Sequence, residues 1–252
     1  MRPARAFALG LLHGPAELLP VSSSAHAALL LQDLDPERRK EAEVALHAGT
    51  LAALGPPRLA PWLVLSTLPP AVAGLLFEKP IQERLGTRRG IAAGLVAGGI
   101  AMVVADGVAP ARRRGLSRRG RRPSRPRPSA ADALVVGLAQ AAALVPGVSR
   151  HGAALTALRA RGFAREDAHA ISREAAKPVL AGAAALKAFR FAASARSRAT
   201  SRPEGVALAA ATAGSALSTL LAARALERRG VRAPLWPFAL YRAGLAAVLA
   251  AT

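Results

Sequence analysis

Long uncharged stretches recur along the chain. They cover residues 6–32, 44–57, 59–77, 90–105, 133–149, 179–186, 206–223 and 233–252, with Glu17 and Arg242 as isolated charges. A helix that crosses a membrane needs about 20 mainly apolar residues. Several stretches reach this length only with their flanks, and they are apolar all round instead of amphipathic. The pattern predicts an all-α, polytopic integral membrane protein and disfavours a soluble, alanine-rich helical bundle.

Two of these stretches are interrupted by turn-forming residues. Residues 6–32 contain a Gly-Pro pair, a further proline and three serines at 22–24. Residues 133–158 contain a Pro-Gly pair followed by Ser149 and Arg150. Non-helical backbone at membrane depth is tolerated only inside protein or along a wet cavity. Each stretch therefore predicts a re-entrant hairpin of two helices joined by a polar turn.

The two halves of the chain resemble each other. Residues 10–13 parallel 137–140, the two serine-containing turns follow in the same order, and residues 70–74 parallel 178–182. An odd number of spans in each half inverts the second copy relative to the first. The sequence therefore predicts two inverted repeats, each with one re-entrant hairpin and about three transmembrane helices.

Charge is distributed unevenly. The 252 residues carry 35 Lys+Arg against 15 Asp+Glu, a formal net charge of +20, and nine arginines fall within 112–127 without an acid between them. No aromatic side chain interleaves with this run, so it offers bases no stacking platform, and we expect no nucleic-acid partner. The positive-inside rule makes it cytoplasmic. We expect one membrane domain, 1–252, in which an Arg-rich cytoplasmic linker (109–130) joins repeat 1 (about 1–108) to repeat 2 (about 131–252).

Composition removes further classes. The chain has no cysteine, which excludes disulfides, cysteine nucleophiles and cysteine metal sites. Its hydrophobic fraction of 52% is too high for a disordered chain.

Ionisable and hydroxyl side chains gather on the two hairpins. His13 and Glu17 are four residues apart and share one helix face. The serines that follow offer hydroxyl and N–H groups to an anion, and Arg150 offers a fork that matches phosphate oxygens. These residues predict an oxyanion or phosphate site with room for a divalent cation. The alternative is structural: serines bonded to backbone carbonyls, and Glu17 paired with Arg150.

Two segments carry a family resemblance. Residues 17–26 (Glu-Leu-Leu-Pro-Val-Ser-Ser-Ser-Ala-His) resemble the first signature of the undecaprenyl-diphosphate phosphatases, also called bacitracin-resistance proteins, and residues 146–152 (Pro-Gly-Val-Ser-Arg-His-Gly) resemble the second. Weaker matches extend the resemblance over nearly the whole chain except the linker, at residues 46–50, 68–77, 137–140 and 237–242.

The resemblance implies a multi-pass enzyme of the plasma membrane with its active site toward the outer face. It would hydrolyse undecaprenyl (C55 polyprenyl) diphosphate to undecaprenyl phosphate and inorganic phosphate, which recycles the lipid carrier for peptidoglycan synthesis. The implied cofactor is a divalent cation, Mg²⁺ or Ca²⁺. The expected partners are the polyprenyl diphosphate lipid and the membrane, and a homodimer is kept open.

The resemblance also carries site residues. Glu17 matches the second acid of a paired-acid motif, Ser23 a serine that acts as nucleophile or substrate ligand, and His26 a proton-transfer or orienting histidine. The catalytic residues implied are Glu17, Ser23, His26 and Arg150; the substrate-binding residues are Ser22, Ser24, Gln140, Gly147 and Ser149; the metal ligands are Glu17 and His13.

The chain departs from the family pattern at several of these positions. His13 replaces the first acid, His47 stands where the family usually has glutamine, and His151 replaces a serine. A histidine can ligate a metal but brings no negative charge. Two alternatives therefore stay open: a polyprenyl-phosphate flippase or transporter, and a catalytically weakened paralogue.

Overall fold

The computed structural model describes residues 1–57, 60–108, 127–194, 202–229 and 232–251. Within these ranges the protein is all-α, as predicted, with ten helices. The predicted linker falls mostly on residues 109–126, outside the described residues. In chain order the helices are α1 (Pro3–Leu18), α2 (Ser23–Leu30), α3 (Pro36–Leu54), α4 (Pro61–Leu85), α5 (Arg88–Val108), α6 (Ala130–Ala142), α7 (Arg150–Ala160), α8 (Arg165–Ser194), α9 (Arg202–Arg229) and α10 (Trp236–Ala251).

Each predicted broken stretch forms two helices joined by a short turn. The chain leaves α1 at Leu19, which is extended, and α2 begins at Ser23. Helix α1 continues through Pro15 and does not break at the Gly-Pro pair. In the second stretch α6 ends at Ala142, and Ser149 caps α7 by accepting a hydrogen bond from the Gly152 amide at 3.1 Å.

An ion pair closes the open end of each hairpin. Arg5, near the start of α1, donates to both carboxylate oxygens of Asp33 at 2.5 and 2.7 Å. The hydrogen bond from the Arg5 guanidinium lowers the pKa of the Asp33 carboxyl to about 2. In the second hairpin Arg161 donates to Asp132 at 2.7 Å. The charges are exchanged between the two hairpins, because the arginine precedes the acid in one and follows it in the other.

Helices α4, α5 and α9 are long and apolar enough to cross a membrane, and α6 and α10 are shorter apolar helices. Their outward faces carry large apolar side chains that water would not favour, such as Leu75, Leu76, Ile100 and Leu221. This exposure fits helices surrounded by lipid.

The described residues group into two compact units, and each draws on both halves of the chain. Unit 1 consists of residues 1–19, 23–57 and 177–229. Unit 2 consists of residues 20–22, 58–176 and 230–252.

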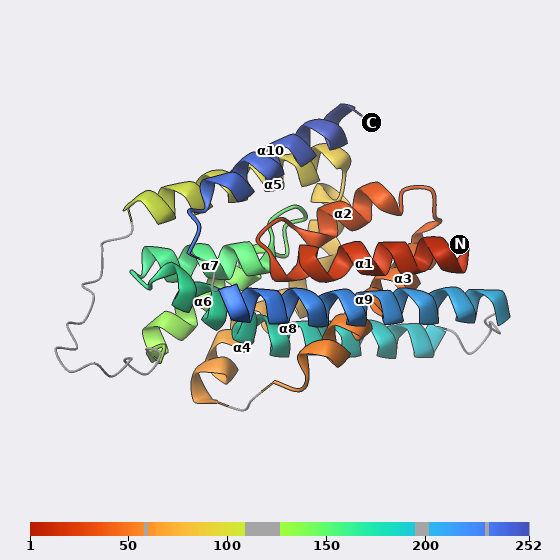
Figure 1. The fold of residues 1–252 in the computed structure, drawn as a ribbon, viewed down its shortest axis with the longest axis horizontal. Coiled ribbons are helices and arrows are strands. Elements are labelled where there is room, and N and C mark those ends of the chain that lie inside the picture. Colours follow the sequence, from red (N-terminus) through yellow and green to blue (C-terminus); the bar gives the residue numbers. More distant parts are fainter. Residues whose placement is uncertain (58–59, 109–126, 195–201, 230–231, 252) are drawn as a thin grey trace. The chain divides into compact units, whose positions relative to one another are not determined.

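In unit 1, α9 packs along α1 and against α3 (Figure 1). Small residues allow this close approach: a Cβ at Gly10, Gly14 or Gly49 would overlap the backbone of α9. Hydroxyl groups of α9 then reach backbone carbonyls on its neighbours. Ser218 donates to the Gly10 carbonyl at 2.9 Å, and Ser215 donates to the Leu46 carbonyl at 2.7 Å.

Replacing Gly49 with alanine is expected to loosen unit 1. The new methyl group would meet the Thr212 carbonyl and the Ala216 amide of α9, and overpacking of this kind costs about 2 kcal/mol. Thermal unfolding of the purified protein in detergent measures the effect. Gly205→Ala on α9 is the matched control, because nothing lies within 4 Å of its Cβ. An equal unfolding temperature for both variants would contradict the packing.

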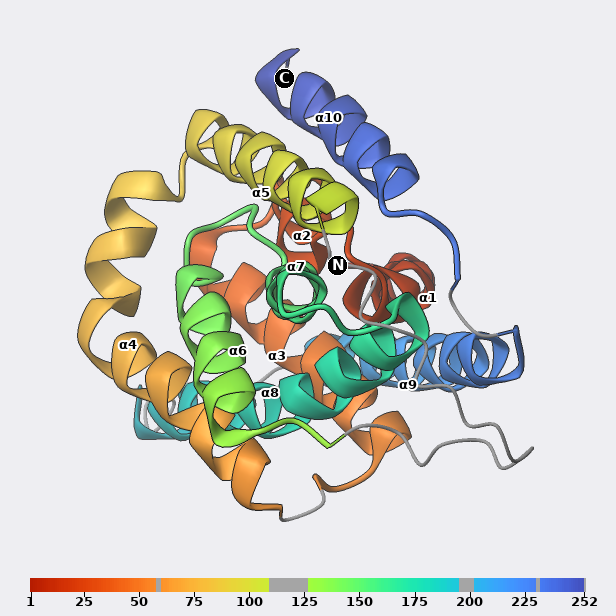
Figure 2. The same ribbon diagram turned by 90° about the vertical axis from the view of Figure 1, so that its left-hand side faces the viewer.

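In unit 2, α6 lies beside α4, α10 lies beside α5, and α7 packs against both α5 and α6 (Figure 2). Buried apolar side chains from these helices form one core that includes Met102, Leu155 and Leu158.

Asp106 accepts hydrogen bonds from residues at the ends of several helices in unit 2. Its side chain, 8% exposed, accepts from Arg159 at 2.7 Å, from Arg165 at 2.9 Å and from the Leu235 amide at 3.2 Å. The carboxylate therefore joins the end of α5 to the end of α7 and to the starts of α8 and α10.

Candidate active site

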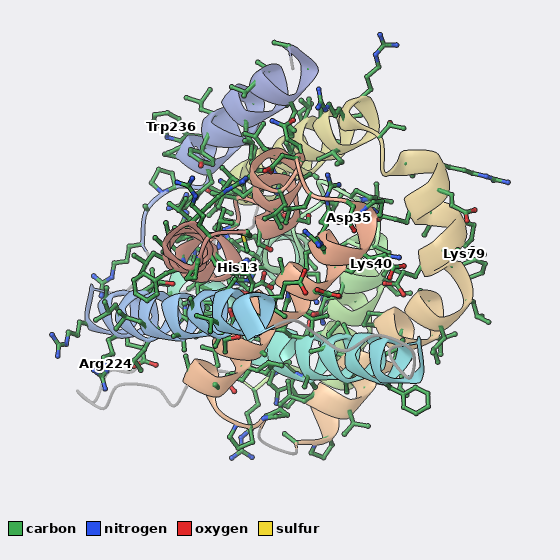
Figure 3. The ribbon with its side chains drawn as sticks, turned by 90° about the vertical axis from the view of Figure 1, so that its right-hand side faces the viewer. His13, Asp35, Lys40, Lys79, Arg224 and Trp236 are labelled. Carbon is green, nitrogen blue, oxygen red and sulfur yellow. The ribbon has the colours of Figure 1, made fainter. Side chains whose placement is uncertain are left out.

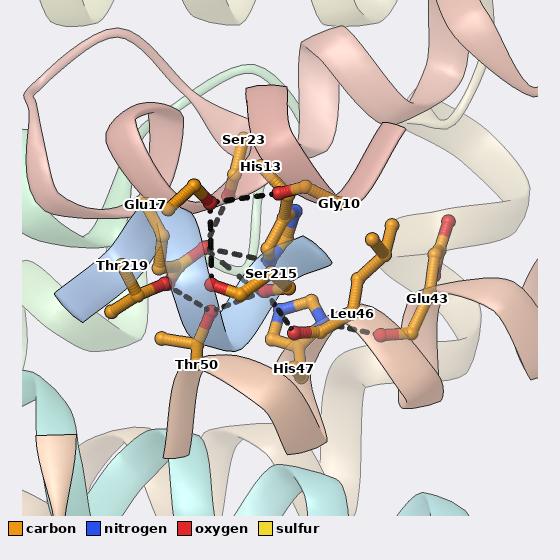
Figure 4. A network of polar contacts seen from close by, with 11 residues as sticks. Gly10, His13, Glu17, Ser23, Glu43, Leu46, His47, Thr50, Ser215 and Thr219 are labelled. Carbon is orange, nitrogen blue, oxygen red and sulfur yellow. Dashed lines mark hydrogen bonds and ion pairs between the residues drawn. The ribbon is translucent and has the colours of Figure 1, made fainter. Parts of the chain in front are cut away.

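The first hairpin brings Ser23 to Glu17. The Ser23 hydroxyl donates to Glu17 Oε2 at 2.5 Å, across the turn that joins α1 to α2 (Figure 4). His13, one helical turn before Glu17, places its Nε2 3.9 Å from the same oxygen. The prediction that His13 and Glu17 share one helix face is confirmed in this geometry.

A third side chain reaches the same carboxylate from α3. His47 Nε2 lies 4.0 Å from Glu17 Oε2, and the His13 and His47 rings are 5.0 Å apart between centroids. The other nitrogen of His47, Nδ1, lies 2.7 Å from the Glu43 carbonyl oxygen. Because a carbonyl only accepts, Nδ1 carries a proton, and in the neutral ring Nε2 then keeps its lone pair.

The packing of α9 fixes this cluster. Thr50, one turn after His47, lies 3.1 Å from Ser215 and 3.3 Å from Thr219 between hydroxyl oxygens. The three hydroxyls are buried. They hold α3 at the distance from α1 at which His47 meets Glu17. In Figure 3 His13 lies among the helices of unit 1, whereas Arg224 points outward from α9.

The remaining predicted residues of the first hairpin differ in exposure. His26 is half-buried and lines a pocket with Ser23, His13 and apolar side chains of α1, α2 and α3. Ser24 is exposed, and Ser22 is 1% exposed. Ser22 has φ +70°, a strained value for a residue with a Cβ and one that clusters at functional sites.

The second hairpin lies in unit 2. Arg150 is the first residue of α7, directly after the capping Ser149. Gly147 has φ +89°, and a Cβ there would overlap the backbone of α5. Gln140 is buried between α6 and α4, where its amide donates to the Ser66 carbonyl at 3.5 Å. The substrate-binding roles of these residues stay predictions.

Arg242 joins the two turns inside unit 2. This side chain of α10 is 1% exposed and donates to the carbonyls of Leu95, Pro20 and Gly147 at 3.0, 3.4 and 3.1 Å. Pro20 belongs to the first turn and Gly147 to the second. A single guanidinium therefore holds both turns, and Ser22 follows two residues after Pro20.

Comparison with known proteins decides the family. Residues 57–248 match the family described as bacitracin resistance protein BacA. The chain belongs to the BacA family. It is 36% identical to the undecaprenyl-diphosphatase of Geobacter sulfurreducens, over 93% of this chain and 92% of that protein. It is 34% identical to that of Pelobacter propionicus (96% and 94% covered) and 32% identical to that of Chromohalobacter salexigens (96% of each).

Two residues of this BacA chain matter more than the sequence indicated. The sequence marks His47 only as a departure from the family resemblance, with no sign that it neighbours Glu17. Arg242 ends a weak family match at residues 237–242 and is otherwise marked as the one charge in an apolar stretch. That isolation was a usable signal, because an ionisable group at membrane depth is costly and is retained for a function.

Replacing Arg242 with alanine is expected to destabilise unit 2 by about 3 kcal/mol or more. The change opens a cavity and leaves buried carbonyls of both turns without their donor, and each such loss costs about 1–3 kcal/mol. Thermal unfolding in detergent measures it. Arg224→Ala, at an exposed position of α9, is the control and should change stability by less than about 0.5 kcal/mol. Equal effects of the two changes on the unfolding temperature would contradict the role of Arg242 in holding the two turns.

Proposed function

We propose that this protein hydrolyses undecaprenyl diphosphate to undecaprenyl phosphate and inorganic phosphate. The observation that carries the proposal is the 2.5 Å hydrogen bond from Ser23 to Glu17 in the first signature of a BacA-family chain. A hydroxyl whose proton points at a carboxylate is arranged to lose that proton to it.

The reaction breaks the bond between the terminal phosphorus and the bridging oxygen. Ser23 Oγ, or a water molecule in its place, attacks the terminal phosphorus in line, and undecaprenyl phosphate leaves with the bridging oxygen. Glu17 takes the proton of the attacking hydroxyl. Attack by water releases inorganic phosphate directly. Attack by Ser23 leaves a phosphoserine, and a water molecule must then attack its phosphorus and break the Oγ–P bond, which releases inorganic phosphate and restores the hydroxyl. His26, whose ring lines the same pocket as Ser23, supplies or removes the second proton.

Charge on the diphosphate needs neutralisation more than covalent help from the protein. Arg150 supplies a guanidinium at the N-terminal end of α7, where helix N–H groups also favour anions. Ser22, Ser24, Ser149, Gln140 and Gly147 belong to the same two hairpins and complete the proposed substrate contacts.

The predicted Mg²⁺ or Ca²⁺ does not fit the donors present. These hard cations take oxygen ligands, about six or more. Among the described residues, the group that could hold a metal is one carboxylate and two imidazoles: Glu17, His13 and His47. No step of the proposed reaction passes through Mg²⁺ or Ca²⁺, which stays a prediction from the resemblance.

Two inverted repeats are the proposed architecture of the single membrane domain, with repeat 1 at about 1–108 and repeat 2 at about 131–252. The first arm of each hairpin packs on the fourth helix of the opposite half: α1 on α9, and α6 on α4. Gly10 and Gly137, which correspond in sequence, both lie at these contacts. The exchanged ion pairs at the hairpin ends support the same relation.

The proposed hairpins re-enter the membrane without crossing it. With 13 residues, α6 rises roughly 20 Å, less than the ~30 Å of a hydrocarbon core. Its first turn carries Asp132, which pairs with Arg161. The arginine-rich linker is proposed to face the cytoplasm. The opening of the active site toward the outer face stays a prediction from the family resemblance.

A phosphatase in the plasma membrane would return the lipid carrier to peptidoglycan synthesis, and its activity would oppose bacitracin.

Transport of polyprenyl phosphate is the second candidate function. His13 favours it, because a site with one acid instead of two holds less negative charge for a cation. A homodimer stays a prediction.

Reconstitution into liposomes separates hydrolysis from transport. With undecaprenyl diphosphate, we expect phosphate release by the wild type and at least a 10²-fold slower release by Ser23→Ala. Transfer of undecaprenyl phosphate between leaflets without phosphate release from the diphosphate would instead identify a transporter.

A further inference from the structure

We infer that His13, Glu17 and His47 form a binding site for a nitrogen-preferring transition-metal cation such as Zn²⁺. The inference concerns the carboxylate that also binds Ser23, so it deepens the proposed function. Its evidence is the geometry and chemistry of three side chains from α1 and α3, all in unit 1.

The three ligand atoms already converge. Glu17 Oε2 lies 3.9 Å from His13 Nε2 and 4.0 Å from His47 Nε2, and one donor atom from each residue lies within 4.8 Å of the others. Ligands held about 2.1 Å from a tetrahedral Zn²⁺ are about 3.4 Å apart. Small side-chain rotations would therefore close the set around an ion.

The backbone contact and the burial of His47 suit this side chain to bind a metal. Histidines that bind metals usually donate their second ring N–H to a carbonyl or carboxylate, which fixes the tautomer. The Nδ1 of His47 has this bond to the Glu43 carbonyl, at 2.7 Å. The side chains of His13, Glu17 and His47 are 5%, 9% and 18% exposed, so water competes weakly and one edge stays open.

The donor set selects the kind of cation. Two imidazoles and one carboxylate are a typical ligand set of catalytic zinc and of other first-row transition metals, whereas Mg²⁺ and Ca²⁺ prefer oxygen alone. Three protein ligands would leave a coordination position for an oxygen of water or phosphate. His13 and His47 meet at one carboxylate, so imidazole nitrogens outnumber carboxylate groups in this set.

Metal binding can be read without turnover, so its failure is distinct from failure of the proposed hydrolysis. The full-length protein in detergent is stripped with a chelator and titrated with Co²⁺, whose visible absorption rises when it leaves octahedral water for a site of low coordination number. We expect one Co²⁺ per chain, displaced by equimolar Zn²⁺ but not by a 100-fold excess of Mg²⁺. His47→Gln should weaken Co²⁺ binding at least 10-fold. His151→Ser, which also removes one imidazole, should leave it unchanged.

A second measurement needs no variant. The X-ray absorption spectrum of the Zn²⁺-loaded wild type should show two imidazole nitrogens and carboxylate oxygen in the first coordination shell of the metal.

A double variant tests the choice of cation. The double change His13→Glu with His47→Gln should reverse the preference of the site from Zn²⁺ toward Mg²⁺. The inference is overturned if the wild type binds no Co²⁺, if His47→Gln and His151→Ser bind it equally, or if Mg²⁺ displaces it as well as Zn²⁺ does.

Discussion

Replacing Arg150 with alanine is expected to lower kcat/KM for undecaprenyl diphosphate by about 10³-fold. The guanidinium provides two parallel N–H donors and a fixed charge where negative charge gathers on the transferred phosphoryl group. Arg150→Lys keeps the charge but loses the fork, so we expect an intermediate rate. Phosphate release at several substrate concentrations gives kcat and KM separately.

The control for this prediction is an exposed arginine. Arg89, near the start of α5, is exposed, and Arg89→Ala should leave kcat/KM within about two-fold of the wild type. A loss in Arg150→Ala no greater than that in Arg89→Ala would remove Arg150 from the proposed site.

Replacing Glu17 with glutamine is expected to slow phosphate release by about 10³-fold, within the range for loss of a general base. The amide keeps the size of the side chain and a hydrogen bond to Ser23, but it accepts no proton and is a poorer metal ligand. The fold should survive, because the close packing of α1 on α9 at Gly10 and Gly14 stays unchanged.

Glu83→Gln is the matched control. Glu83 is an exposed acid of α4 whose carboxylate lies 4.0 Å from Lys79, and exposed pairs of this kind contribute about 0–1 kcal/mol. Its activity should match the wild type. Retained turnover in Glu17→Gln, with Ser23→Ala inactive, would assign the proton to another group and contradict the role of the carboxylate.

The hairpins could be predicted from sequence because their signals are local. Proline, glycine and serine interrupt apolar stretches, and the chain leaves the helix near them: α1 ends at Leu18, before Pro20, and α7 starts directly after Ser149. The pair of His13 and Glu17 followed from helical spacing alone.

The contact of His47 with Glu17 could not be predicted in this way. The two residues lie on different helices, and their approach depends on a third, α9, which packs on glycines of α1 and α3. The partners of Arg242 are equally hidden, because Pro20 and Gly147 take part through backbone carbonyls that leave no side-chain signal. Sequence spacing predicts faces of single helices, whereas these sites are set by packing between helices.

The claim that the protein cleaves the diphosphate bond is tested most directly by ³¹P NMR of undecaprenyl diphosphate incubated with the purified protein in detergent. We predict that the diphosphate resonances disappear while undecaprenyl phosphate and inorganic phosphate grow in equal amounts, and that Ser23→Ala leaves the diphosphate intact over the same time. Unchanged diphosphate resonances with the folded wild type, titrated in turn with Zn²⁺, Mg²⁺ and Ca²⁺, would contradict the assignment as a phosphatase.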